Sequence, residues 1–150
     1  MYSIDLKLIT LLQQNARTPL KNLAEQVYLS SPATAARIEK LEKDGIISSY
    51  SAQIDLKKAG YPIIAFINLD LEPNEKPTFY PFIRSHPNVL ECNCVTGHYS
   101  QLIKVAFEST EALDGFVGEL NAFGHTETQI AFSEPQPPRG IDLEKATNKR

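Results

Sequence analysis

The amino-acid sequence predicts an α+β protein of two parts, in which three short helices precede an antiparallel sheet that carries two helices on one face. Before Gly45, apolar residues recur three times at the spacing of three to four residues that marks a helix. From Ile63 onward the patterns follow the order strand, helix, strand, strand, helix, strand. With 150 residues the chain is long enough for two small domains.

The first two helices are predicted from their apolar stripes. The first stripe is Ile4, Leu8, Leu11 and Leu12, and the second is Leu20, Leu23, Ala24 and Val27. The segment Asn15-Ala16-Arg17 breaks the first helix. Thr18 is expected to cap the second helix, with Pro19 at its first position, where the missing N–H costs nothing.

A third helix is expected between a cap at Ser30 and a left-handed glycine stop at Gly45. Only Tyr28 and Leu29 separate it from the second helix, so the turn between the two is tight. Its inward face consists of Thr34, Ile38 and Leu41. Its outward stripe consists of Ala33, Ala36, Arg37 and Lys40.

Two helices that cross at a tight turn are typical of proteins that place a helix in the major groove of double-stranded DNA. Small outward residues allow close approach, Arg37 suits a bidentate contact to guanine, and Lys40 suits a phosphate. Ser30 and Ser31 at the helix N-terminus suit a backbone phosphate. The predicted DNA-binding set is therefore Ser30, Ser31, Pro32, Ala33, Ala36, Arg37 and Lys40. The alternative is a solvated helix face with two positive charges.

The charge distribution agrees weakly with this division of tasks. Residues 1–60 hold eight Lys/Arg against six Asp/Glu, and residues 61–150 hold seven against twelve. The mildly basic N-terminal part suits contact with phosphates, and the acidic C-terminal part suits a different task.

Residues 47–54 alternate like a strand and are either a wing against the minor groove or a link between domains. Lys57, Lys58 and Gly60 resemble a hinge. The predicted organisation is a DNA-binding domain (1–47), a hinge strand or linker (48–60), a sensing and oligomerisation domain (61–133) and a tail (134–150).

The back domain is predicted to be a ferredoxin-like βαββαβ sandwich. Its first strand, from Ile63 to Leu71, is apolar on one face and half apolar on the other, so one face is expected to meet a partner subunit. A helix is expected around 79–83, strands at 90–96 and 101–107, a helix from Ser109 or Thr110, and a last strand at 126–132. The proline-rich tail is expected to be loose or arm-like, with helix only near 142–145.

Cys92 and Cys94 suggest a redox or metal site, but a disulfide between next-but-one strand residues is strained and zinc needs more ligands. Buried, reduced thiols are the preferred interpretation. His86 and His125 are expected to be exposed, and His98 is equally a pH-sensitive ligand contact or a turn residue. No cofactor or metal is expected. The chain lacks a secretory signal and any apolar run of about 20 residues, so we expect a cytoplasmic protein without membrane contact.

Residues 2–133 resemble the leucine-responsive/AsnC (Lrp/AsnC) family of prokaryotic transcription regulators. The resemblance is carried by Ile4-Asp5-Leu6, Leu11-Leu12, Asn15-Ala16-Arg17, Leu23-Ala24, Leu29-Ser30, Arg37-Ile38, Leu41-Glu42, Asp44-Gly45-Ile46-Ile47, Val95-Thr96-Gly97-x-Tyr99 and Leu102-Ile103-Lys104. It implies a winged helix-turn-helix, a ligand-sensing domain of the RAM type, and a homodimer that often assembles into octamers. It also implies an amino acid or related metabolite as effector, bound between dimers by Thr96, Gly97, His98, Tyr99 and Ser100.

Two positions depart from the family pattern. Relatives usually carry acidic residues where this chain has His98 and Ser100, so the acidic pair that would hold an amino group is absent. Position 36, often basic in relatives, is alanine here.

Two alternatives to a DNA-binding regulator remain open. Sirohaem decarboxylases resemble the same two-domain architecture, but their tetrapyrrole chemistry depends on histidine and basic residues, and the back half has only Lys76, Arg84 and Lys104 before the tail. The other alternative is a ligand-sensing assembly whose front half no longer binds DNA. We expect a regulator rather than an enzyme.

Overall fold

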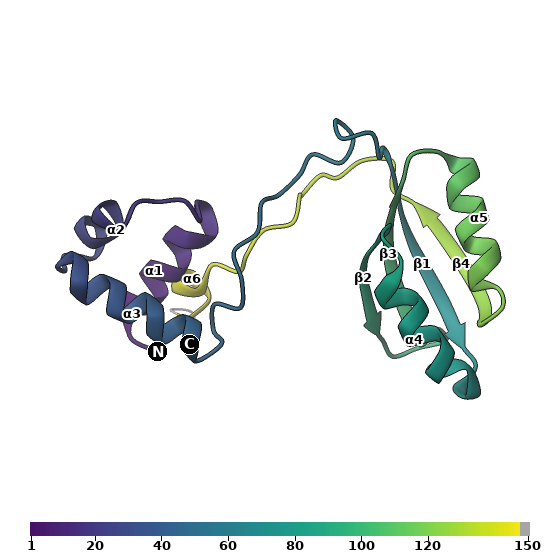
Figure 1. The fold of residues 1–150 in the computed structure, drawn as a ribbon, viewed down its shortest axis with the longest axis horizontal. Coiled ribbons are helices and arrows are strands. Elements are labelled where there is room, and N and C mark those ends of the chain that lie inside the picture. The colour runs from purple at the N-terminus through teal and green to yellow at the C-terminus, as the bar shows by residue number, and fades with distance from the viewer. Residues whose placement is uncertain (148–150) are drawn as a thin grey trace. The chain divides into compact units, whose positions relative to one another are not determined.

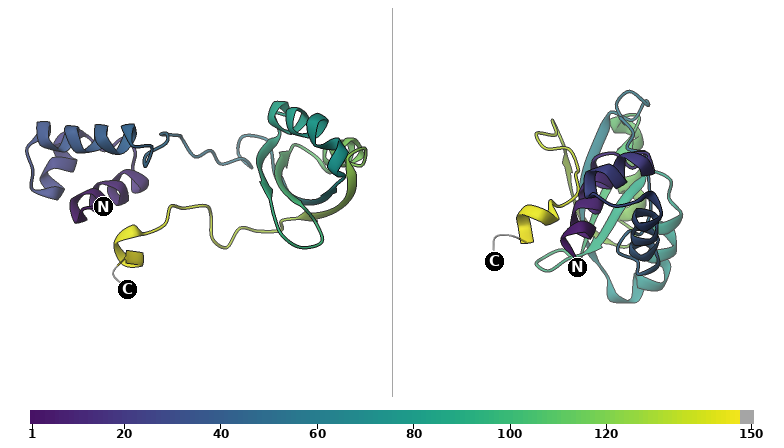
Figure 2. Two further views of the ribbon diagram at one scale, coloured as in Figure 1. Left: turned by 90° about the horizontal axis from the view of Figure 1, so that it is seen from below. Right: turned by 90° about the vertical axis from the view of Figure 1, so that its left-hand side faces the viewer.

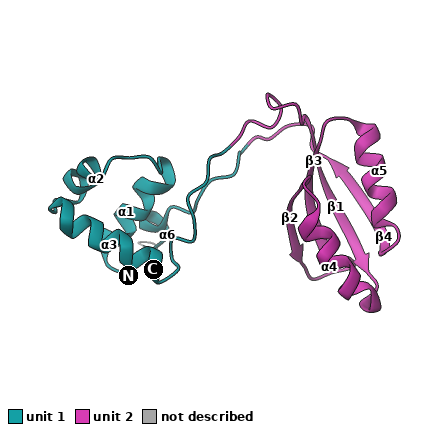
Figure 3. Cartoon of the chain, in the orientation of Figure 1, with its two compact units in different colours: residues 1–53, 136–150 teal, residues 54–135 magenta. Residues whose placement is uncertain are grey.

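The computed structural model describes residues 1–147, which form two compact units (Figure 3). One unit comprises residues 1–53 together with residues 136–147, and the other comprises residues 54–135. The domain boundaries predicted at 47, 60 and 133 stay predictions. None of the helices among residues 1–147 is long and apolar enough to cross a membrane.

The first unit is built on three helices, α1 (Ser3–Gln14), α2 (Leu20–Val27) and α3 (Ser31–Lys43) (Figure 1). Leu8 of α1 packs against Leu23 and Val27 of α2, and these side chains are the centre of the core. The partly buried apolar residues around them are Ile4, Leu11, Leu12, Leu29 and Ile38. Each stripe predicted from the helical spacing therefore supplies core residues.

Two of the four predicted helix signals in this unit, the Ser30 cap and the Gly45 stop, are confirmed. The Ser30 hydroxyl accepts a hydrogen bond from the Ala33 amide at 3.2 Å, as an N-cap should. Gly45 has φ +73° and follows the end of α3. The Thr18 cap is wrong: its hydroxyl donates to the Asn15 carbonyl at 2.6 Å instead. Pro19 is the N-cap of α2, so the helix begins one residue later than the proline rule suggests.

The strand predicted for residues 47–54 is not formed. In this part of the chain, residues 48–55 run without helix or strand pairing, because a strand needs a neighbouring edge to satisfy its backbone groups. Tyr50 is nevertheless fixed, since its hydroxyl donates to Glu42 Oε1 at 2.7 Å. Partial burial and the Glu42 carboxylate raise the pKa of Tyr50 to about 12.

The second unit confirms the ferredoxin-like prediction. Its strands, β1 (Ile63–Leu71), β2 (Val89–Cys94), β3 (Gln101–Phe107) and β4 (Gly124–Ile130), form one antiparallel sheet in the order β2-β3-β1-β4. A 3₁₀ turn, η1 (Pro73–Glu75), leads into α4 (Lys76–Ser85) after β1, and α5 (Thr110–Leu120) follows β3. Ser109 caps α5 by accepting from the Ala112 amide at 3.1 Å.

The sheet has one face covered by helices and one open face. Ala65, Ile67 and Leu69 of β1 are fully buried against a core to which α4 adds Phe79 and α5 adds Phe116. The alternating residues Ile64, Phe66 and Asn68 are only half-buried. Figure 2 shows the twist of this sheet, with both helices packed on it. The second face of β1, which the sequence predicted to be half apolar, is therefore not covered within one chain.

The C-terminal tail has no helix or strand from residue 134 to residue 142 and then forms a short helix, as expected. A short helix, α6 (Leu143–Thr147), lies beside α1, and the Gln13 side-chain amide donates to the Ile141 carbonyl at 3.0 Å. Asp142 accepts from the Lys145 amide at 3.1 Å, and this hydrogen bond lowers the pKa of Asp142. The sequence allowed a short helix near 142–145 but did not predict its contact with α1, which a local pattern does not encode.

Candidate functional site

The turn between α2 and α3 fixes how the third helix is presented. Tyr28 ends α2 in the left-handed conformation at φ 57°, and its side chain is 93% exposed. The Leu29 amide donates to the Ala24 carbonyl at 3.1 Å, and Ser30 then caps α3. The Thr34 side chain, fully buried, donates to the Ser30 carbonyl at 2.9 Å. The result is a helix-turn-helix with a rigid, three-residue turn.

The outward face of α3 is exposed and made of small side chains. Ala33 and Ala36 lie in the middle of this face, with Pro32 and Ser30 at the N-terminal end and Lys40 at the other. Ser31 is half-buried. A surface without long apolar side chains leaves the helix backbone open to close approach by a partner.

Arg37 differs from the expected stripe. Its Nη1 donates to Asp5 Oδ1 at 3.0 Å, and its guanidinium lies 5.6 Å from the centre of the Tyr2 ring. The side chains of Arg37 and Asp5 are 33% and 14% exposed, so the pair is partly shielded from water. Arg37 therefore fastens α3 to the start of α1, a role that its position in the outward stripe did not suggest.

Lys40 is an exposed cation of the outward face and has a local partner. Its ammonium lies 2.6 Å from Asp44 Oδ2, one turn along α3, and both side chains are well exposed. The hydrogen bond and the charge of Asp44 raise the pKa of Lys40. An exposed pair of this kind is weak and is readily exchanged for a phosphate.

In the second unit, the predicted effector residues form the loop between β2 and β3. The Val95 amide donates to the Ser100 carbonyl at 2.9 Å, and Gly97 sits at the tip with φ +109°. Ser100 is anchored to β1, because its amide donates to the Leu69 carbonyl and its hydroxyl accepts from the Leu71 amide, both at 3.1 Å. Thr96 and His98 are exposed.

Tyr99 connects this loop to the last strand. Its hydroxyl donates to Glu127 Oε2 at 2.9 Å, and its ring stacks on His125 with centres 6.3 Å apart. The Glu127 carboxylate raises the pKa of Tyr99. His125 is exposed as predicted. The loop thus carries an aromatic ring beside a carboxylate that the motif itself does not contain.

Two predictions about thiol and imidazole groups are wrong. Cys94 is exposed and Cys92 only half-buried, since both lie on β2, which is an edge strand. His86 is half-buried rather than exposed: its ring lies 4.7 Å from that of Phe116, and its Nδ1 accepts from the Asn88 amide. Among residues 1–147 no group of three or more His, Cys, Asp or Glu side chains is placed to hold a metal ion.

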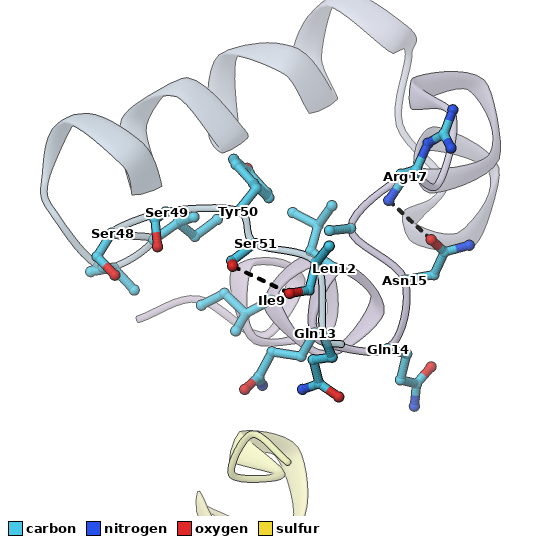
Figure 4. A pocket seen from close by; sticks show the side chains of 15 residues that line it. Ile9, Leu12, Gln13, Gln14, Asn15, Arg17, Ser48, Ser49, Tyr50 and Ser51 are labelled. Carbon is cyan, nitrogen blue, oxygen red and sulfur yellow. Dashed lines mark hydrogen bonds between the residues drawn. The ribbon is translucent and has the colours of Figure 1, made fainter. Parts of the chain in front are cut away.

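The first unit also contains a groove of about 750 Å³. Figure 4 shows it between the end of α1, the turn at Asn15–Arg17 and the segment from Ile46 to Gln53. None of the predicted DNA or effector residues lines it.

A helix-turn-helix joined to a βαββαβ sheet domain with a structured β2–β3 loop defines a DNA-binding transcription regulator with a ligand-binding domain. The comparisons with known proteins agree. Residues 3–48 match the family model "Winged helix-turn-helix DNA-binding", and residues 64–141 match "Lrp/AsnC ligand binding domain". The chain belongs to the Lrp/AsnC family of transcription regulators.

The alignments with similar proteins cover almost the whole chain. YezC of Bacillus subtilis, an HTH-type transcriptional regulator, is 38% identical over 133 residues, which cover 89% of this chain and 94% of YezC. The structure of E. coli AsnC superposes with a TM-score of 0.85 at 30% identity, covering 95% of this chain and 98% of AsnC. A complex of the Neisseria meningitidis regulator NMB0573 with L-Met shares the fold, with a TM-score of 0.91 at 24% identity over 97% of this chain and 99% of that one. The family consists of regulators, and the enzyme alternative is discarded.

Proposed function

We propose that this protein is a cytoplasmic, sequence-specific transcription regulator whose dimers read DNA with α3 and respond to a small metabolite at the β2–β3 loop. The observation that carries the proposal is the outward face of α3, which is exposed, small and supported by a rigid turn. The proposed contact set is Ser30, Ser31, Pro32, Ala33, Ala36, Arg37 and Lys40. Arg37 contributes by holding α3 on α1 through Asp5.

The electrostatics of this surface support contact with the DNA backbone. The N-terminus of α3 points its partial positive charge toward Ser30 and Ser31, and Lys40 adds a full charge at the other end of the face. With alanines between these points, base edges are reached through apolar contact and close approach rather than through long side chains.

The open face of the sheet supports a symmetric dimer. Ile64 and Phe66 of β1 and Leu102 of β3 are half-buried apolar residues on this face, and Lys104 lies 5.7 Å from the Phe66 ring centre. Face-to-face pairing about a two-fold axis removes these residues from water on both subunits. Assembly of dimers into octamers, as in the family, is part of the proposal.

The β2–β3 loop supports binding of an amino acid or related metabolite between dimers. Thr96, Gly97 and His98 are exposed at its tip, and Tyr99 and Ser100 hold its base. Glu127 lies at the Tyr99 hydroxyl and supplies a carboxylate for an amino group, which compensates for the missing acidic pair at positions 98 and 100. The N. meningitidis neighbour crystallised with L-Met makes that amino acid the first probe.

The DNA part of the proposal is tested by fluorescence anisotropy with the duplex upstream of the protein's own gene. We expect affinity at least about 10³-fold above that for an unrelated duplex of equal length at the same salt concentration. Equal affinities for the two duplexes would contradict a sequence-specific regulator and favour a sensing assembly without DNA recognition.

The effector part is tested with Gly97→Asp. Aspartate at φ +109° costs about 1–3 kcal/mol of backbone strain, so the loop must rearrange, although no neighbour clashes with the new Cβ. We expect amino acids, L-Met first, to raise the melting temperature of the wild type but not of the variant, while DNA affinity without ligand is unchanged. Gly115→Asp, on the exposed side of α5 with open space around it, is the matched control and should respond as the wild type does. An unchanged response of Gly97→Asp would place the ligand elsewhere.

A further inference from the structure

Four side chains of the second unit form a polar cluster that the proposed regulator function does not use. Cys92 and Cys94 stand on the helix-covered face of β2, opposite Ile103 and Gln101 of β3. Gln101 is only 2% exposed. Tyr80 reaches the cluster from α4, which lies beside β2 (Figure 1).

The buried amide of Gln101 is satisfied by the two sulfur atoms. Its Oε1 accepts from Cys92 Sγ at 3.5 Å and from Cys94 Sγ at 3.6 Å, and its Nε2 donates to Cys94 Sγ at 3.2 Å. If a buried amide loses its hydrogen-bond partners, the free-energy cost of having removed it from water is no longer offset. Any chemistry at the sulfur atoms therefore changes the environment of Gln101.

The two thiols are unequal. Cys94 is exposed, and its Sγ shares a hydrogen bond of 3.5 Å with the Tyr80 hydroxyl and accepts one from Gln101 Nε2. Both hydrogen bonds lower the pKa of Cys94, helped by the positive charge of Lys76. Cys92 is half-buried, and burial followed by the charge of Cys94 raises the pKa of Cys92. An exposed thiol with a lowered pKa beside a half-buried thiol with a raised pKa is the arrangement of a nucleophile with a resolving partner.

The spacing permits a reversible bond between them. Next-but-one residues of a strand have Cα atoms about 6.6–6.8 Å apart, at the upper limit for a disulfide. Cys94 is the last residue of β2, so a small shortening of the strand disturbs only the end of the ladder. A disulfide under such strain is easily reduced, as a regulatory bond must be in a reducing compartment.

We propose that Cys94 and Cys92 form a peroxide-reactive dithiol site, with Cys94 as nucleophile and Cys92 as resolving thiol, whose oxidation releases Gln101 and rearranges the β2–β3 loop. The Cys94 thiolate attacks one oxygen of a hydroperoxide, the O–O bond breaks, and the alkoxide leaves and takes a proton from solvent. Cys94 becomes a sulfenic acid, oxidised by two electrons. The Cys92 thiol then loses its proton and attacks the Cys94 sulfur, and hydroxide leaves as water. Two thiols and one hydroperoxide thus give one disulfide, one alcohol and one water.

Cys94 and Gln101 flank the β2–β3 loop, so a change at either side chain on oxidation also affects the loop. Cys94 pairs with Gln101 in the ladder, and the adjacent Val95 amide donates to the Ser100 carbonyl at 2.9 Å. Formation of the disulfide removes both S–H donors from Gln101, so this end of the ladder must reorganise. The link from loop to metabolite response rests on the proposed function, but the thiol chemistry and the loop movement do not.

The chemistry is tested on reduced, full-length protein with a small excess of hydrogen peroxide, followed by intact mass spectrometry. The wild type should lose two hydrogen atoms within one chain. Cys92→Ser should accumulate a sulfenic acid at Cys94 that dimedone traps, and Cys94→Ser should not react on this timescale. Equal reactivity of the two single variants, or a disulfide found only between chains, would overturn the proposal.

The environment of Cys94 is tested with Tyr80→Phe, which removes one hydroxyl and keeps the ring in place. The midpoint of the pH–rate profile for alkylation of Cys94 should rise, and the reaction at neutral pH should slow about 3–10-fold. Melting temperature serves as the check on folding. An unchanged profile in a folded variant would contradict a nucleophile tuned by Tyr80.

The loop movement is measured by hydrogen exchange of the reduced and oxidised wild type, without DNA or metabolite. Exchange in residues 95–101 should accelerate on oxidation, while exchange in the core strand β1 stays slow. Oxidation without any change in this segment would refute the coupling, whatever the protein's DNA and metabolite binding prove to be.

Discussion

Replacing Ala36 by glutamate should lower affinity for the upstream duplex about 100-fold, or ~3 kcal/mol. Ala36 is exposed at the middle of the outward face of α3, where the proposal places base edges and flanking phosphates. Glutamate brings a longer side chain and a negative charge into that contact. Ala36→Arg should have the opposite effect: affinity rises, and the slope of log K against log salt steepens by about 1, because one more phosphate is neutralised.

The matched control for this pair is Ala146→Glu, which makes the same change of residue and charge at an exposed helical alanine of α6. It should bind DNA as the wild type does. Melting temperature and oligomeric state should be the same for all four proteins. If Ala36→Glu and Ala146→Glu weaken binding equally, the effect is one of net charge, and the outward face of α3 is not the DNA contact.

Phe66→Lys should convert the dimer into a folded monomer at micromolar concentration. Each Phe66 ring removed from water contributes about 1.5–3 kcal/mol, and a two-fold dimer contains two of them, so the dimer should weaken about 10²–10⁴-fold. The new lysine also lies beside Lys104, whose ammonium now rests over the Phe66 ring. Because Phe66 is only half-buried within one chain, the core of the monomer should survive.

Analytical ultracentrifugation measures this effect directly. Asp114→Lys, on the exposed side of α5 and therefore on the helical layer, is the control and should remain dimeric. A Phe66→Lys protein that sediments as a dimer at the wild-type concentration would refute pairing through the open face of the sheet. The monomer should also bind DNA more weakly, since two half-sites are then read independently.

Local signals account for most of the fold that the sequence predicted. Ser30 and Ser109 satisfy the first free amides of their helices, and Gly45 supplies a left-handed stop, so these helix ends depend only on near neighbours. The period of two between Ile63 and Leu71 likewise fixed which residues of β1 face the helices. Both kinds of pattern arise from backbone geometry, which a sequence carries within a few residues.

The features that the sequence did not predict depend on distant partners. The helical spacing places Arg37 in the outward stripe. In the structure its guanidinium donates to Asp5 of α1, which is thirty-two positions away in the sequence. Residues 47–54 alternate like a strand but find no edge to pair with, and Gln13 binds the Ile141 carbonyl, 128 positions away in the sequence. Cys94 is exposed because β2 is at the edge of the sheet, and sheet order is a property of the whole domain.

Tethered cleavage shows whether the outward face of α3 enters the major groove. Ala36→Cys in a Cys92→Ser, Cys94→Ser background carries an iron chelate, and Ala146→Cys in the same background is the comparison. We expect strand scission from position 36 at two symmetric points inside the protected DNA, separated by whole turns of about 10–10.5 base pairs, and none from position 146. Cleavage from position 36 that is absent, or no stronger than from position 146 on the same bound duplex, would contradict this placement of α3.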